Sequence, residues 1–86
     1  MNSTQTAGET LTINGVTYNV LQVTTPESAE ARGLVNVAAA MRSNGCVREL
    51  GLQRPKGRVV YYTNEYVNRY NGGMVYSDVI SLGVGR

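Results

Sequence analysis

Residues 11–18 read Leu-Thr-Ile-Asn-Gly-Val-Thr-Tyr, and this stretch decides how the first part of the chain folds. Asn14-Gly15 is the preferred pair for a type I′ turn, because both central residues of that turn need a positive φ angle. The turn places apolar side chains of both strands on one face, namely Leu11, Ile13, Val16, Tyr18 and Val20. Turn chemistry and side-chain alternation therefore both predict a β-hairpin, with strands near 10–13 and 16–23.

Residues 26–44 carry the signals of a helix. Thr25 suits the N-cap position, Pro26 fits the first helical position, and Gly45 supplies a left-handed stop. Apolar residues recur at the spacing of one helix face, and they are Ala31, Leu34, Val37, Ala38 and Met41. Gly33 opposes a continuous helix, since an interior Gly costs about 1 kcal/mol relative to Ala. Either one helix packs closely on the sheet at Gly33, or the chain breaks there into a short turn and a helix over residues 34–43.

The rest of the chain alternates between strand-like runs and turns. Composition predicts strands over 46–53, 58–66 and 74–82, with Asp78 interrupting the last one. Arg-Pro-Lys-Gly at 54–57 predicts a tight turn, because Pro suits its second position and Gly tolerates a positive φ. One side of the final strand is predicted to carry Met74, Tyr76, Ile80 and Leu82. The predicted fold class is α+β: an N-terminal β-hairpin, one helix, then a three-stranded antiparallel meander, with the helix packed on one face of an antiparallel sheet.

The length of 86 residues suits one domain, whose core has to be built without Phe or Trp. We expect a single α+β domain over residues 10–83, preceded by a small, polar, flexible tail at residues 1–9. Because so small a core supplies limited stability, we also expect a homo-oligomer. The four-residue spacing of Tyr62, Tyr66 and Tyr70 leaves open whether their rings are core or surface.

Several kinds of catalytic site lack their residues in this chain. There is no His, and Cys46 is the only Cys, so Ser–His and Cys–His nucleophiles and clustered thiolate zinc sites are excluded. Glu49, Glu65 and Asp78 fall on neighbouring predicted strands, where an acid–base pair is conceivable. Ion pairing across strands explains these carboxylates more simply, with the partners Arg48, Arg58 and Arg69. We therefore expect a protein that is not an enzyme and that holds no cofactor and no metal.

The sequence also bears on location. The lone Cys46 cannot form an intrachain disulfide, and no signal-peptide pattern is present, so we expect a reducing, cytoplasmic compartment. No apolar run approaches the roughly 20 residues that span a bilayer, so no membrane partner is expected. Arg42 and Arg48 near Cys46 would lower its pKa if they faced the thiol, but a small buried side chain is the simpler interpretation.

Positive charge is concentrated in the second half of the chain. Residues 1–41 have a net charge of −2 and residues 42–86 a net charge of +4. Several of these cations surround the predicted 54–57 turn, and tyrosines follow on the next strand. Cations displace counterions from phosphates, and Tyr rings can stack on bases. We therefore predict a nucleic-acid-binding site formed by Arg48, Arg54, Lys56, Arg58, Tyr61, Tyr62, Tyr66 and Arg69.

A protein–protein or structural role is the alternative, because Tyr and Arg are also enriched in interface hot spots. The same surface would then serve an acidic partner or a second copy of the chain. Sparse charge with abundant Asn, Thr, Gly and Val resembles the composition of virion or mobile-element proteins. Nucleic-acid binding requires one continuous basic patch with exposed Tyr rings. Assembly requires a dominant apolar or Tyr-lined surface without the cations.

Overall fold

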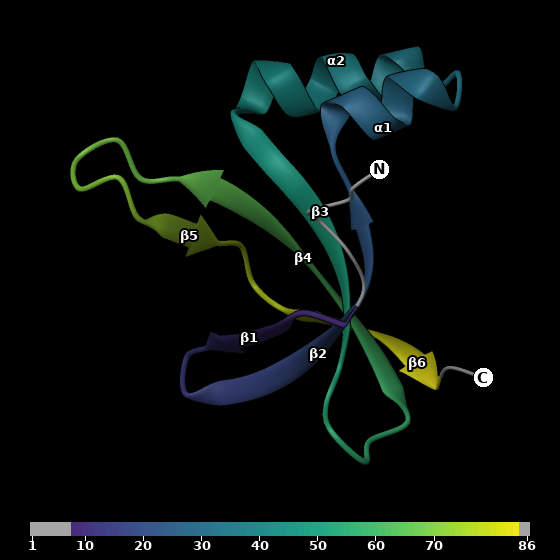
Figure 1. Cartoon of the computed structure of the whole chain (residues 1–86), viewed down its shortest axis with the longest axis vertical. Helices are drawn as coiled ribbons and strands as arrows, with labels where there is room; N and C mark the ends of the chain where they lie inside the picture. Colours follow the sequence, from purple (N-terminus) through teal and green to yellow (C-terminus); the bar gives the residue numbers. More distant parts are fainter. Residues whose placement is uncertain (1–7, 85–86) are drawn as a thin grey trace.

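A computed structural model describes residues 8–84 and shows a mixed protein of two helices and six strands (Figure 1). The predicted flexible tail at 1–9 falls mostly outside the described residues. Gly8, however, belongs to the folded domain, because its N–H donates to the carbonyl oxygen of Val20 at 3.0 Å. In chain order the elements are β1 (Thr10–Ile13), β2 (Val16–Thr24), α1 (Pro26–Ala31), α2 (Val35–Asn44), β3 (Cys46–Gln53), β4 (Val59–Val67), β5 (Met74–Tyr76) and β6 (Ile80–Val84).

The β1–β2 hairpin has the register that its Asn-Gly turn predicts. Ile13 pairs with Val16, and the turn residues Asn14 and Gly15 take φ angles of 52° and 81°. β2 then pairs with β3, and β3 with β4, each in antiparallel orientation. The predicted hairpin is confirmed, and it begins the strand order β1-β2-β3-β4 of the sheet.

The final strand is divided in two, which corrects the predicted three-stranded meander. β5 pairs with the second half of β4, and β6 pairs with its first half. Ser77 lies between them and remains bonded to β4: its Oγ accepts from the N–H of Asn64, and its N–H donates to the carbonyl of Asn64, both at 2.9 Å. The sheet therefore has six strands and not five, and the break falls beside Asp78.

The one helix of the predicted fold is two helices, and of the two alternatives for Gly33 the break is confirmed. Gly33 lies between them with a φ angle of 82°, a left-handed conformation that interrupts a right-handed helix. The predicted ends are confirmed: the N–H of Ser28 donates to Oγ1 of Thr25 at 3.0 Å, and Gly45 ends α2 with a φ angle of 75°.

Both helices lie together at one end of the sheet (Figure 1). The prediction that the helix packs across one face of the sheet is therefore wrong. The reason is that α2 does not concentrate its apolar residues on one face that could cover the sheet. Only Ala38 and Met41 are buried in it, whereas Leu34 and Val37 of the predicted stripe are exposed. Within residues 8–84 neither helix has the length and apolar character needed to cross a membrane.

The sheet buries its apolar side chains by curling around them. The buried cluster consists of strand residues alone, namely Ile13, Tyr18, Val20, Leu50 and Leu52. Leu11 of β1 and Tyr76 of β5, near opposite ends of the strand order, both pack against this cluster, so the curl approaches a barrel. Alternation along each strand gives the sheet an inner face, which holds the cluster, and an outer face, which holds Gly51 and Tyr62.

Candidate functional site

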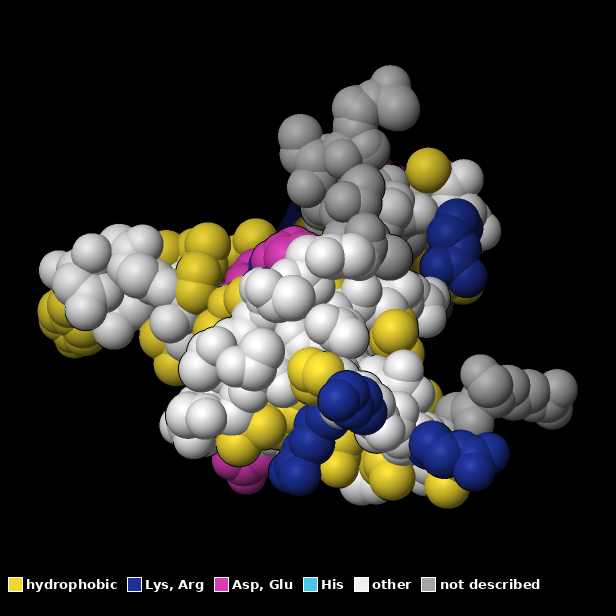
Figure 2. Space-filling model, turned by 60° about the horizontal axis from the view of Figure 1, so that its bottom comes forward, with side chains coloured by type: hydrophobic (Ala, Val, Ile, Leu, Met, Phe, Trp, Pro, Cys, Tyr) yellow, Lys and Arg dark blue, Asp and Glu magenta, His cyan; other side chains and the backbone are white. Residues whose placement is uncertain are grey.

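The cations of the predicted nucleic-acid site lie in three separate places. Arg54, Lys56 and Arg58 surround the turn between β3 and β4, whereas Arg69 follows the far end of β4. The nine residues of β4 separate the two groups by roughly 30 Å. Figure 2 shows Lys and Arg side chains in separate groups, with hydrophobic and uncharged side chains between them. The structure therefore does not bring these cations together in one basic patch.

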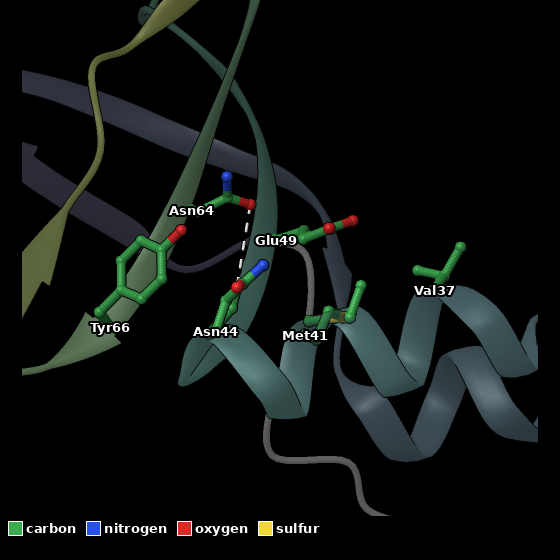
Figure 3. Close-up of a pocket in the computed structure, with 8 residues that line it drawn as sticks. Val37, Met41, Asn44, Glu49, Asn64 and Tyr66 are labelled. Carbon is green, nitrogen blue, oxygen red and sulfur yellow. Dashed lines mark hydrogen bonds between the residues drawn. The ribbon is translucent and has the colours of Figure 1, made fainter.

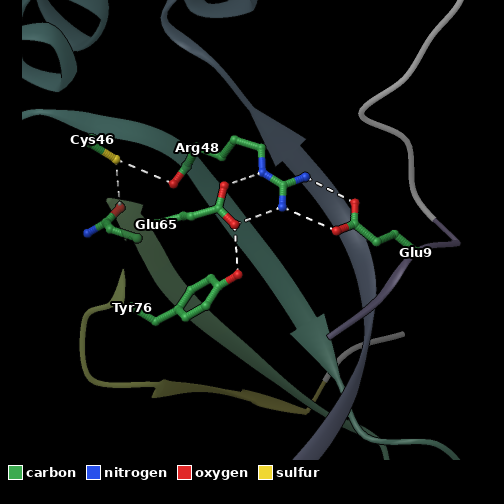
Figure 4. Close-up of polar contacts among 6 residues, drawn as sticks. Glu9, Cys46, Arg48, Glu65 and Tyr76 are labelled. Carbon is green, nitrogen blue, oxygen red and sulfur yellow. Dashed lines mark hydrogen bonds and ion pairs between the residues drawn. The ribbon is translucent and has the colours of Figure 1, made fainter. Parts of the chain in front are cut away.

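Arg48 lies in the third place, on β3, where it forms ion pairs in a cluster with Glu9 and Glu65 (Figure 4). Its Nε donates to Oε1 of Glu65 at 2.6 Å, and its Nη1 donates to Oε1 of Glu9 at 3.0 Å. The hydroxyl of Tyr76 donates to the other oxygen of Glu65 at 2.8 Å. Since the Glu65 side chain is 2% exposed and that of Arg48 14%, this is a buried structural cluster. Of the predicted cross-strand ion pairs, that of Glu65 with Arg48 is present, whereas Glu49 and Asp78 form none within residues 8–84, and sequence reasoning missed Glu9.

Titration directions in this cluster follow from its contacts. Burial raises the pKa of Glu65, but the hydrogen bonds from Arg48 and Tyr76 outweigh it and leave the pKa below its usual value. Hydrogen bonds to Glu65 and Glu9 raise the pKa of Arg48. Burial, and then the hydrogen bond to Glu65, raises the pKa of Tyr76 to about 12. At neutral pH Arg48 and Glu65 therefore stay charged and Tyr76 keeps the proton that it donates to Glu65.

The predicted Tyr rings divide between the two faces of the sheet. The ring of Tyr61 faces inward, 5.6 Å from that of Tyr18 in an edge-to-face contact, and the guanidinium of Arg54 lies 5.7 Å from its centroid. Tyr62 and Tyr66 lie on the outer face and are half-buried. Tyr70 is fully exposed in the loop after β4. Alternation along β4 thus places Tyr61 on the opposite face of the sheet from Tyr62 and Tyr66, so the three rings do not form one surface beside the cations.

No acid–base pair results from the three carboxylates singled out in the sequence. Glu65 lies on the inner face, Glu49 on the outer face, and Asp78 is exposed at the break between β5 and β6. Cys46 is buried, and burial is the main reason that the pKa of its thiol is raised, so the thiolate is disfavoured. Among residues 8–84 no group of three or more His, Cys, Asp or Glu side chains is placed to hold a metal ion.

An apolar patch lies on the outer face, where the helices leave the sheet uncovered. We call it the outer patch, and it consists of Val60, Tyr62, Ile80 and Leu82. Tyr62 pairs directly with Ile80, which is 55% exposed, and Leu82 beside them is 63% exposed. Gly51 has no side chain to fill the space next to Tyr62, so the surface is hollowed there.

Sequence reasoning missed this patch because it continued the alternation through 74–82. Tyr76 packs against the inner cluster as an apolar strand residue should, but the break at Ser77 shifts the register by one residue. A one-residue shift moves the following side chains to the opposite face, so Ile80 and Leu82 point outward. The interrupting Asp78 was the available signal.

A second hollow, of about 210 Å³, lies between α2 and the outer face (Figure 3). We call it the α2 hollow. Its helical wall is apolar except for Asn44 at the end of α2, and its sheet wall is mostly polar. The lining residues are Val37, Ala40, Met41, Asn44, Cys46, Glu49, Asn64 and Tyr66. Within residues 8–84 no Lys or Arg lies at ion-pair distance from the Glu49 carboxylate. Burial, and then the negative charge of Glu49, raises the pKa of Tyr62 to about 12.

Comparison with known proteins adds no further guide, since no family model, curated protein or solved structure matches the chain. Two surface features of the described residues stand out. An apolar patch and an adjoining carboxylate-lined hollow occupy the outer face, and a turn carrying three cations lies at the end away from the helices. These features can bind a partner, and they contain no nucleophile paired with a base.

Proposed function

We propose that this chain is a non-enzymatic interaction protein that assembles with copies of itself through the outer patch. The observation that carries the proposal is the balance of its apolar residues. Among residues 8–84, eleven large hydrophobic side chains are exposed, whereas the large hydrophobic side chains in the buried core are Ile13, Tyr18, Val20, Met41, Leu50 and Leu52. Exposed apolar side chains that lie side by side, as Ile80 and Leu82 do with Tyr62 on the outer face, are typical of interaction sites.

The outer patch supports self-association better than the other exposed apolar residues do. It lies on the second face of a sheet whose first face is already the core, and sheets commonly pack face to face about 10 Å apart. β6 adds an edge strand in which all five residues are exposed and none is charged or Pro. Such an edge lacks the features that usually keep sheets from pairing. An interface of ordinary size takes about 800 Å² per partner, a modest part of the 5767 Å² surface.

Sedimentation equilibrium over a range of concentrations tests the proposal. We expect the wild-type chain to form at least a dimer, and the variants Ile80→Ser and Leu82→Ser each to raise the dimer Kd at least tenfold. Losing a buried aliphatic side chain removes about 1.5–3 kcal/mol, and a symmetric dimer loses it twice.

Met74→Ser is the matched control, because Met74 is 50% exposed but pairs with Val67 at the end of β4, away from the outer patch. It should leave the Kd within about twofold of wild type. A constant monomer mass up to high micromolar concentration would reject the proposal.

Nucleic-acid binding is the second candidate, and one observation favours it. Within residues 8–84 no carboxylate lies at ion-pair distance from Arg54, Lys56 or Arg58, so the β3–β4 turn carries three free cations. Three phosphate contacts would give a slope of about −2 to −3 in log K against log salt. Changing all three residues to Ser should flatten that slope. No binding of single- or double-stranded oligonucleotides below about 100 μM in low salt would end this candidate.

A further inference from the structure

Lys56 occupies a backbone position that does not suit it. It is the third residue of the β3–β4 turn, which is closed by the Gly57 N–H donating to the Arg54 carbonyl at 2.9 Å. Its φ angle is 65°, and the only other non-Gly residue described with a positive φ is Asn14, a residue type that tolerates it. The sequence predicts Gly57 for this conformation, yet Lys56 adopts it. A long cationic side chain is thus held at the tip of the turn although a Gly there would be less strained.

Lys56 shares with Arg58, and not with Arg54, the absence of a side-chain partner within residues 8–84. Arg54 stacks over Tyr61, whereas Lys56 is exposed and forms no ion pair within residues 8–84. It is the only Lys in the chain. Its side chain is a compact charge on a flexible stem of four carbons, so it can enter a narrow site that a planar guanidinium fits less well.

The α2 hollow has the complementary chemistry. Val37, Ala40 and Met41 form an apolar wall for a hydrocarbon stem, and Glu49 supplies a carboxylate without a cation. The volume of about 210 Å³ equals about seven water molecules in the liquid, which is room for one aliphatic ammonium side chain. It is smaller than the roughly 300–1,000 Å³ of sites for drug-sized ligands.

We infer that Lys56 of each copy enters the α2 hollow of a second copy and pairs with its Glu49. This inference rests on the proposed self-association and specifies its geometry. Lys56 cannot reach Glu49 of its own chain, because seven residues along β3 and the turn separate them by roughly 20 Å. The intended occupant is therefore the turn of another copy, and the opposite charges select it.

The spacing along the sheet fits a two-fold dimer built on the outer patch. Val60 pairs with Gln53, and Lys56 lies three residues beyond Gln53, or about 10 Å. In the other direction Glu49 pairs with Asn64. Asn64 lies four residues from Val60, so the level of Glu49 is about 13 Å from the level of Val60. A two-fold axis at the level of Val60 would therefore place each Lys56 over the partner's hollow while the two outer patches face each other. Both ion pairs form at once, as an isologous interface requires.

Reciprocal charge reversal tests this geometry by sedimentation. Glu49→Lys and Lys56→Glu each place two like-charge contacts in a homodimer, so each should raise the dimer Kd at least tenfold. An equimolar mixture of the two variants forms heterodimers in which both contacts again join opposite charges. That mixture, and the double variant Glu49→Lys/Lys56→Glu, should return to within about threefold of the wild-type Kd. Arg32→Glu changes net charge as Lys56→Glu does, but Arg32 is exposed at the C-cap of α1 and does not line the α2 hollow, so it should have little effect.

Zero-length carbodiimide coupling gives an independent reading, since it joins an amine to a carboxylate as an amide with loss of water. We expect a covalent dimer whose digest joins the peptides containing Lys56 and Glu49. Thermal melting of each variant shows whether it is folded. If the wild type dimerises but Glu49→Lys does so equally well, or if mixing restores nothing, this geometry is wrong while self-association stands. If the wild type is a monomer, both proposals are wrong.

Discussion

Replacing Glu65 by Gln tests whether the ion-pair cluster holds the curled sheet together. The change keeps the size of a side chain that is 2% exposed but removes its charge and turns one acceptor oxygen into a donor. The new amide would meet either Arg48 or the hydroxyl of Tyr76, both of which donate to Glu65 in the native cluster. Arg48 keeps Glu9 as a partner, at 3.0 Å.

The expected loss is about 3 kcal/mol of unfolding free energy. Removing one partner of a buried ion pair costs about 3–5 kcal/mol, and the remaining contact with Glu9 places this variant at the low end. For a domain of this size 1 kcal/mol corresponds to about 4–8 °C, so the Tm should fall by about 12–24 °C. Thermal and urea unfolding followed by circular dichroism measure both quantities.

Glu30→Gln is the matched control, because Glu30 and Arg42 form an ion pair in which both side chains are about half exposed. An exposed pair contributes about 0–1 kcal/mol, so this variant should stay within a few degrees of wild type. If Glu65→Gln were no less stable than Glu30→Gln, the cluster would not have the structural role assigned to it.

The same residue sets a pH dependence. The folded-state pKa of Glu65 is below its usual value of 4.5, so its stabilisation is present above the unfolded pKa and is lost as the pH falls through the folded pKa. Wild-type stability should therefore decline from about pH 5 downward. In Glu65→Gln this decline should be shallower, which urea unfolding at a series of pH values would show.

Other substitutions test separate parts of the structure. Lys56→Gly should stabilise the fold by about 0.5–1 kcal/mol, because it relieves a left-handed backbone, yet it should weaken dimerisation; urea unfolding and sedimentation measure the two effects. Thr25→Ala should cost about 1 kcal/mol in urea unfolding by removing the cap on Ser28, and an unchanged midpoint would contradict the cap. Leu50→Ala should cost about 2–5 kcal/mol, since Leu50 is fully buried, and a loss below 1 kcal/mol would place the core elsewhere.

Local chemistry predicted the local structure well. The Asn14-Gly15 turn sets the hairpin register, and Thr25 and Gly45 mark helix ends, because each signal acts within a few residues. The position of the helices was not predictable in the same way. An apolar stripe at helical spacing implies a covered sheet face, but α2 buries only Ala38 and Met41, and the sheet covers its core by curling instead.

The candidate site was the least predictable part, because it depends on which face each residue occupies. One extra residue at the break beside Ser77 turns Ile80 and Leu82 outward, and period-two alternation alone cannot reveal such a shift. The predicted cations separated for a similar reason. Arg48 pairs with Glu9, which lies 39 residues earlier in the chain. No local sequence pattern indicates such a long-range partner.

Glu9 lies far from Arg48 and Glu65 in the sequence, and this separation affects folding during synthesis. Synthesis proceeds from the N-terminus at about 5–20 residues per second, so the first strand emerges seconds before β4 and β5 exist. Until then the β1–β2 hairpin can form its turn. Arg48, however, has no Glu65 to pair with, and the apolar side chains of the inner face lack the strands that bury them. Non-local closure of this kind slows folding, because loop-closing entropy is lost before the contacts are made. The nascent chain should therefore remain open, and within reach of chaperones, until almost its whole length has emerged.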